Sequence, residues 1–210
     1  MGEKILTDKN VKSAYYMAKY KKSCDSPAWD GMTRTILIDG MEQEHALALI
    51  RYHILHGPSG CVKRFDIPKS NGKTRPISIY PLLDRVAQWC IMEPLRKACG
   101  PLLSPINHAF LKGKSCKTAF DAFPPAGEAG YVICGDIHSF FDSVSHSLVR
   151  ACLWSAGIRD SQLLHTINVT LKTPYKYPKQ PKVRPEQGLP QGAPISPLLA
   201  NIILAYMDRY

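Results

Sequence analysis

Apolar residues recur every three or four positions in several stretches of this chain, which is the spacing of one face of an α-helix. In the first such stretch the apolar face carries Val11, Ala14 and Ala18, and lysines occupy the opposite face. The period is strong enough, and the stretches long enough, to predict helices rather than strands. We predict helices over residues 10–21, 42–56, 82–98, 146–156, 161–171 and 197–208.

Residues at the ends of these stretches agree with helix starts and stops. Asn10, Ser145 and Ser196 are predicted N-caps, since short polar side chains accept hydrogen bonds from the first free backbone N–H groups. Pro197 then suits the first helical position, and Gly57 suits the position after a helix. Within the third helix, a proline at position 94 is expected to kink the helix or divide it in two.

The period changes to that of strands after the second helix. Two short runs rich in β-branched residues flank Asn71-Gly72, and Asn-Gly is the strongest short signal for a hairpin. We therefore predict a hairpin across residues 62–79 that projects from the body. Cations at its turn fit either protection of a strand edge against aggregation or the binding of phosphate groups. These cations are Lys69, Lys73 and Arg75.

A second strand signal lies in the middle of the chain. Residues 131–134 (Y-V-I-C) are apolar, favour strands and lack a helical period, so we predict a buried strand over 131–136. This strand would carry Asp136 to its end. A carboxylate in such a place fits a metal ligand and a turn cap equally well. A second acid, Asp142, follows two phenylalanines.

Composition limits the class of protein. The chain has 210 residues, 45% of them hydrophobic and 21% charged, which is typical of a globular protein rather than a disordered tail. It has seven cysteines without a C-x-x-C pair, and we interpret them, including Cys134 and Cys152 in apolar runs, as reduced core thiols of a cytosolic protein. No apolar run is long enough to span a membrane, and the N-terminus shows no signal-peptide core.

A formal charge of +10, from 27 basic and 17 acidic residues, favours a polyanionic partner such as nucleic acid. Basic residues alternate with Tyr175 and Tyr177 in a proline-rich segment, which fits nucleic-acid contact and a solvated loop equally well. Lysines also flank Ser115, a predicted helix start that would offer N–H groups to a phosphate. The candidate nucleic-acid-binding residues are Lys112, Lys114, Lys172, Lys176, Lys179, Lys182 and Arg184.

Several of these segments occur together in the order found in one family. They are I-P-K-S-N-G-K-T-R-P-I-S-I, D-R-V-A-Q, F-L-K-G-K-S, G-D-I-H-S-F-F-D-S-V and G-L-P-Q-G-A-P-I-S-P-L-L-A-N. Together they resemble bacterial reverse transcriptases, most closely those of group II introns and their retron and CRISPR-associated relatives. The resemblance implies an α+β fold of the right-hand polymerase type. Residues 1–130 would form an N-terminal extension and the fingers, and residues 131–210, after the breaker P-P-A-G-E-A-G, the first half of the palm.

The resemblance also implies a metal site. Asp136 would be the first catalytic aspartate, and with the Ile137 carbonyl it would bind two magnesium ions. The family completes this site with a Y-x-D-D hairpin, but the 210 residues contain no D-D pair, and the sequence resembles the fingers and half of a palm. Asp142 is interpreted as a cap of the helix that follows it. The remaining palm and the thumb would be supplied by the rest of the gene or by a second chain.

The same resemblance assigns residues to the incoming nucleotide. Phe141 would stand under the sugar and reject a 2′-hydroxyl, while Lys69 and Arg75 would grip the triphosphate. Gln191 would line the nucleotide pocket, and Gly192 would let the backbone approach the nucleotide.

The implied function is RNA-directed DNA polymerisation in the cytoplasm of a prokaryote, with an RNA template, a DNA primer and deoxynucleoside triphosphates as partners. These 210 residues alone are expected to be inactive. Two alternatives remain open, an RNA-dependent RNA polymerase and a non-catalytic RNA-binding remnant of a reverse transcriptase. An aromatic side chain at Phe141 argues against the RNA polymerase, which must admit a 2′-hydroxyl.

Overall fold

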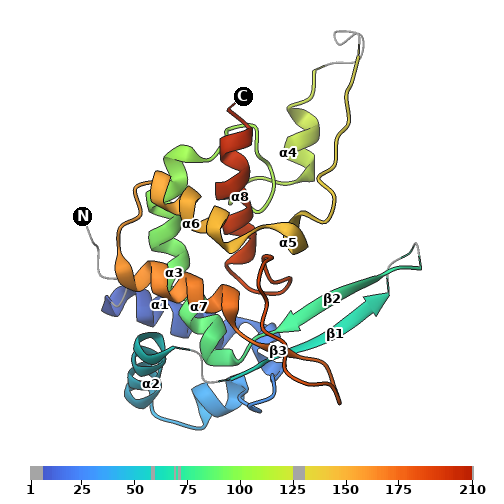
Figure 1. Ribbon diagram of the computed structural model, residues 1–210. Helices are drawn as coiled ribbons and strands as arrows, with labels where there is room; N and C mark the ends of the chain where they lie inside the picture. Colours follow the sequence, from blue (N-terminus) through green and yellow to red (C-terminus); the bar gives the residue numbers. More distant parts are fainter. Residues whose placement is uncertain (1–6, 58–59, 69, 71, 125–130, 210) are drawn as a thin grey trace.

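The structure is a computed structural model that describes residues 7–57, 60–68, 70, 72–124 and 131–209. Helices form most of the body, and a small three-stranded sheet extends from it (Figure 1). In chain order the elements are α1 (Asp8–Tyr20), the 3₁₀ turn η1 (Lys22–Asp25), the π turn η2 (Thr35–Asp39), α2 (Gln43–His56), β1 (Val62–Pro68), β2 (Thr74–Ile79), α3 (Leu82–Cys99), η3 (Gly100–Leu102), α4 (Cys116–Asp121), α5 (Phe140–Ser143), α6 (His146–Ser155), α7 (Ser161–Lys172), β3 (Tyr175–Lys176) and α8 (Ser196–Met207).

All six predicted helices are present, with ends within two residues of the prediction, but two of their caps differ. Thr7 caps α1 in place of Asn10, whose backbone N–H donates to the Thr7 hydroxyl. Ser145 caps α6 as predicted. Ser196 is the first helical residue of α8 rather than its N-cap, and its hydroxyl donates to the Pro190 carbonyl at 2.8 Å. Helix α3 runs through its internal proline without dividing.

The predicted hairpin is confirmed. Strands β1 and β2 pair antiparallel, with Lys63 opposite Ile79 and Pro68 opposite Thr74, and the hairpin projects from the helical body (Figure 1). Asn71 and Lys69 lie outside the described residues. Strand β3 was not predicted, because its two residues are too few to show a period; it pairs parallel with β1 at Val62.

Two apolar cores share helix α3. The first half of α3 packs against α1 and α2, and its second half packs with the C-terminal helices α6, α7 and α8. Figure 1 shows α3 between these two groups of helices. Helix α3 therefore connects the N-terminal and C-terminal parts of the chain. The division at residue 130 stays a prediction.

Helix α3 also buries polar side chains from the D-R-V-A-Q motif. The Asp84 carboxylate forms a hydrogen bond with the imidazole of His53 on α2, and both residues are buried. Arg85 donates to the carbonyls of Ser23 and Ser26. Gln88, fully buried, accepts from the backbone N–H of Ile195, just before α8. Helical periodicity predicted only the apolar stripe of this helix, so these links were not foreseen.

Asp84→Ala is expected to lower the free energy of unfolding by about 3 kcal/mol, because it leaves His53 buried without its partner and opens a small void. Burial raises the pKa of the Asp84 carboxyl, which the hydrogen bond from His53 opposes. Urea unfolding measures the loss. Glu93→Ala is the matched control on the same helix, because the Glu93–Arg96 ion pair is exposed and should cost less than about 1 kcal/mol. Equal losses in the two variants would contradict this prediction.

The predicted buried strand over 131–136 is wrong. Residues 131–137 adopt no regular structure, and the side chains of Tyr131 and Ile133 are each 96% exposed. A strand is stable only when its backbone pairs with a neighbour, and no other strand of the described residues pairs with this segment. Cys134 is consequently exposed, not a core thiol. Cys116 is exposed as well, so the prediction of core thiols is wrong for these two cysteines, whereas Cys152 and the others are buried as predicted.

None of the helices among the described residues is long and apolar enough to cross a membrane.

Candidate active site

The loop of residues 187–192, which carries the G-L-P-Q-G motif, is tied to two separate parts of the fold. On one side, the backbone N–H of Gly188 donates to Val144 at 2.7 Å and that of Leu189 donates to Phe141 at 2.6 Å. On the other side, the Gln191 carbonyl accepts from the backbone N–H of Ser78 on β2 at 2.8 Å. The loop therefore joins the hairpin strand β2 to the segment that contains α5.

Glycine is required where this loop touches β2. Gly192 has a positive φ of 108°, and a Cβ built at this position would lie 2.2 Å from the carbonyl oxygen of Ser78. Gly188, with φ of 95°, has a similar role, since its Cβ would lie 3.1 Å from the Phe141 carbonyl. The atoms that come close to these two glycines belong to the protein backbone. Contact between Gly192 and a nucleotide stays a prediction.

A histidine that the sequence did not single out also holds this loop. His146, the first residue of α6, is buried, and its Nε2 lies 3.1 Å from the Gly188 carbonyl oxygen. Burial lowers the pKa of His146, while the bond to Gly188 opposes this shift. Since a carbonyl oxygen only accepts, the imidazole donates its Nε2–H to the loop. No sequence pattern marks such a residue, because its partner lies on a distant segment.

Phe141 lies on α5, and its backbone carbonyl accepts the hydrogen bond from Leu189 of the loop. Its ring is half-buried against the C-terminal core and lies edge-on to Phe140, with ring centroids 5.9 Å apart. Asp142 is exposed in the same short helix, and its backbone carbonyl accepts from Gln187 at 3.5 Å. The prediction that Asp142 caps the following helix is wrong, because Ser145 holds that place through a hydrogen bond from Leu148 N–H.

Asp136 and Ile137 precede α5 in the exposed segment 131–137. Among the described residues, no cluster of three or more histidine, cysteine, aspartate or glutamate side chains is arranged to hold a metal ion. A pair of magnesium ions needs several oxygen ligands. The donor set around Asp136 therefore does not, by itself, fit the two ions that the resemblance implies.

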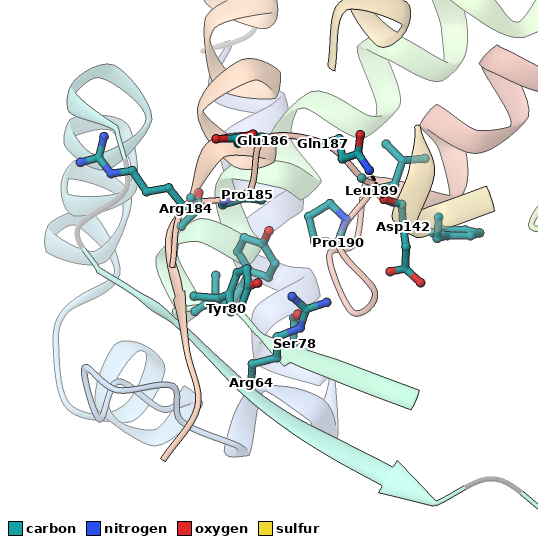
Figure 2. Close-up of a pocket in the computed structure, with 15 residues that line it drawn as sticks. Arg64, Ser78, Tyr80, Asp142, Arg184, Pro185, Glu186, Gln187, Leu189 and Pro190 are labelled. Carbon is teal, nitrogen blue, oxygen red and sulfur yellow. Dashed lines mark hydrogen bonds between the residues drawn. The ribbon is translucent and has the colours of Figure 1, made fainter. Parts of the chain in front are cut away.

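A cavity of about 310 Å³ lies beside the loop, lined by residues of β1, β2, β3, α5 and the segment 184–190. Figure 2 shows the Arg64 guanidinium pointing toward Pro190, and the Arg184 guanidinium pointing away. Arg64 stacks on Tyr175, with its Cζ 4.2 Å from the ring centroid, and its buried Nε has no hydrogen-bond partner. Phe141 also lines this cavity. The cavity therefore adjoins the predicted nucleotide-binding residues without containing Arg75 or Gln191.

The remaining predicted residues fall in different places. Arg75 is exposed on β2, opposite Ile67 of β1. Lys112 and Lys114 are exposed before α4, and the Lys114 ammonium donates to the Pro105 carbonyl at 3.0 Å. Figure 1 shows α4 in the upper part of the view and β3 in its lower half. The basic residues at and after the end of α7 are therefore a separate group; they are Lys172, Lys176, Lys179, Lys182 and Arg184.

The chain is similar to known proteins over most of its length. Residues 67–210 match the family described as "Reverse transcriptase (RNA-dependent DNA polymerase)". Protein YkfC of Escherichia coli (strain K12) is 33% identical over 201 residues, which cover 90% of this chain and 51% of YkfC. The group II intron-encoded protein LtrA of Lactococcus lactis subsp. cremoris is 31% identical over 155 residues, 71% of this chain and 25% of LtrA. The retron Mx65 reverse transcriptase of Myxococcus xanthus is 28% identical over 174 residues, 78% of this chain and 39% of that protein.

A solved structure, "Partial Cas6-RT-Cas1--Cas2 complex", contains a chain with the same fold, with a TM-score of 0.55 and 24% sequence identity over 98% of this chain and 34% of that one. The predicted α+β fold, fingers with part of a palm, is confirmed. This chain spans about half the length of YkfC and a quarter of LtrA. The family profile covers well over half of the chain, in the segments that build the loop, the hairpin strand and α5. On this evidence the chain belongs to the reverse transcriptase family.

Proposed function

We propose that this chain contributes the fingers and part of the palm to an RNA-directed DNA polymerase, which extends a DNA primer with deoxynucleoside triphosphates on an RNA template. The observation that carries the proposal is the double attachment of loop 187–192. It holds Gln191 between the strand that bears Arg75 and the short helix that bears Phe141. The backbones of three segments that are distant in the sequence are thereby joined, which supports a shared nucleotide site.

Each of these residues has a role that suits nucleotidyl transfer. The Arg75 guanidinium, together with the Lys69 ammonium, would neutralise triphosphate oxygens. The Phe141 ring is held by its packing, and a fixed ring under the sugar would clash with a 2′-hydroxyl. Gln191 and Gly192 would line the nucleotide site. Together these residues would bind and orient the nucleotide and exclude ribonucleotides.

Members of the reverse transcriptase family generally use divalent metal ions. Two magnesium ions, when bound, would stabilise the attacking and leaving oxygens. Asp136 and the Ile137 carbonyl would supply part of their ligands, and the other carboxylates would come from a Y-x-D-D hairpin outside these 210 residues, in the rest of the gene or on a second chain. The exposure of residues 131–137 supports this division, because the segment is open to such a partner strand.

A second candidate function is an RNA-binding remnant without catalysis. The observation that favours it is the absence of a metal-binding cluster among the described residues. Primer extension on an RNA template by the full-length protein separates the two functions. For either one we infer a cytoplasmic location in a prokaryote, which the bacterial relatives support.

We expect the chain to bind an RNA/DNA hybrid with little sequence preference and with an affinity that falls steeply as salt rises. The +10 charge implies phosphate contacts that release counterions, so the logarithm of affinity should decrease linearly with the logarithm of salt concentration. Fluorescence anisotropy over a salt series measures the slope. Lys179→Gln should reduce the slope by about one, since it removes one phosphate contact. Lys12→Gln, an exposed lysine on α1, should not change the slope. A slope of zero for the unmodified chain would contradict the prediction.

A further inference from the structure

A tryptophan near the start of the hairpin is exposed and surrounded by lysines. Trp29 follows η1, and its side chain is 43% exposed. The ammonium of Lys63 on β1 lies 5.6 Å from the centroid of its ring, and that of Lys176 on β3 lies 5.5 Å from it. A large aromatic side chain in water, close to two cations from different strands, is typical of a nucleic-acid contact.

The tryptophan also borders a hollow. A cavity of about 290 Å³ is lined by Trp29, Asp30, Gly60, Cys61, Lys176 and Lys182. The two lysines are near enough to the buried Cys61 thiol to oppose the rise in its pKa that burial causes. The acid in this lining is Asp30, whose carboxylate already accepts from the backbone N–H of Met32 at 3.3 Å. The hollow therefore combines an aromatic wall with an excess of positive charge.

We propose that Trp29, Lys63, Lys176 and Lys182 form a binding site for single-stranded RNA, in which an unpaired base stacks on the indole and the lysines hold the adjacent phosphates. The site deepens the proposed function, on which it rests: an unpaired RNA strand in that reaction is the template before it is copied. Two of its lysines lie on β1 and β3, and Figure 1 shows β3 beside the start of β1, where the sheet adjoins the helical body.

Physical chemistry favours a single strand over a duplex here. In a duplex the flat faces of the bases are covered by their neighbours, so an indole finds a free face only on an unstacked, unpaired base. Stacking of one base contributes about 5- to 150-fold in affinity, whereas an exposed cation–π contact contributes about 2- to 5-fold. A base can therefore displace a lysine from the ring. The flexible lysine stem then lets the ammonium reach a phosphate.

The test measures binding of a labelled single-stranded oligouridine to the full chain by fluorescence anisotropy. Trp29→Ala should weaken binding about tenfold, because it removes the stacking surface. Trp29→Phe should retain most of the affinity. Trp154→Ala is the matched control: Trp154 is also exposed, at 56%, and also stacks on a cation, Arg159. Its affinity should equal that of the unmodified chain.

Two further measurements keep the result interpretable. Lys182→Glu leaves the indole in place and alters an exposed side chain, so it tests the site without risk to the fold; it should also weaken oligouridine binding. Binding of a blunt RNA duplex should be unchanged by Trp29→Ala. Unchanged oligouridine binding in both variants, or an equal loss on duplex, would overturn the proposed site while leaving the polymerase function standing. Absence of binding to any nucleic acid by the unmodified chain at low salt would overturn both.

Discussion

Replacing Asp136 with alanine is expected to lower primer extension by the full-length protein at least about 1,000-fold. A metal ion contributes several kcal/mol to stabilising the charge that develops during transfer, and each 1.36 kcal/mol corresponds to a factor of ten in rate. Asp136 is the acidic ligand that the family resemblance assigns within these 210 residues. Single-turnover extension of a labelled DNA primer on an RNA template measures the rate.

Asp142→Ala is the matched control, because Asp142 is an exposed acid in the same region and engages the loop through its backbone carbonyl rather than its carboxylate. It should extend primers at close to the normal rate. A polypeptide of residues 1–210 alone should show no extension, and addition of the remaining palm, with its Y-x-D-D hairpin, and the thumb in trans should restore it. Robust extension by residues 1–210, lost on Asp136→Ala, would refute this account and make Asp142 the next candidate ligand.

Gly192→Ala is expected to have the largest effect of any substitution in loop 187–192. The new Cβ would lie 2.2 Å from the Ser78 carbonyl oxygen, which is backbone and cannot rotate away, and the positive φ adds strain. We expect the free energy of unfolding to fall by about 2–5 kcal/mol. A displacement of the loop by about 1 Å would also lower the extension rate about 100-fold. Urea unfolding and primer extension measure the two effects.

Gly113→Ala separates steric overlap from backbone strain. Gly113 has a similar positive φ of 79°, but its Cβ would meet no atom within 4 Å. This variant should lose only the cost of a left-handed conformation, about 1–2 kcal/mol. If both variants lost the same stability, the contact between Gly192 and Ser78 would not be the cause.

The sequence predicted the elements whose signals are local. Helices with a clear period and the hairpin around Asn71-Gly72 were found because spacing and turn residues determine them within a few positions. The strand over 131–136 was mispredicted because strand formation depends on a partner strand, which a run of apolar residues does not reveal. An apolar run can equally be an exposed segment whose partner strand lies elsewhere.

The candidate site was predicted in part for the same reason. Resemblance pointed to Phe141, Gln191 and Gly192, and the structure brings the segments that carry them together. The resemblance did not reveal that Gly192 packs closely against the backbone of β2, or that His146 forms a hydrogen bond to the loop. These relations join segments far apart in the sequence, so they become visible only once the chain is folded.

The backbone hydrogen bond between Ser78 and Gln191 has a mechanical consequence. A projecting hairpin that is fastened at its base behaves as a cantilever, in which bending is small near the support and grows toward the free end. Ser78 lies in the last part of β2, whereas Arg75 lies nearer the turn. A movement of the hairpin that brings Arg75 toward a triphosphate would therefore pivot at Ser78. Part of that force would be transmitted through the hydrogen bond to the loop that bears Gln191.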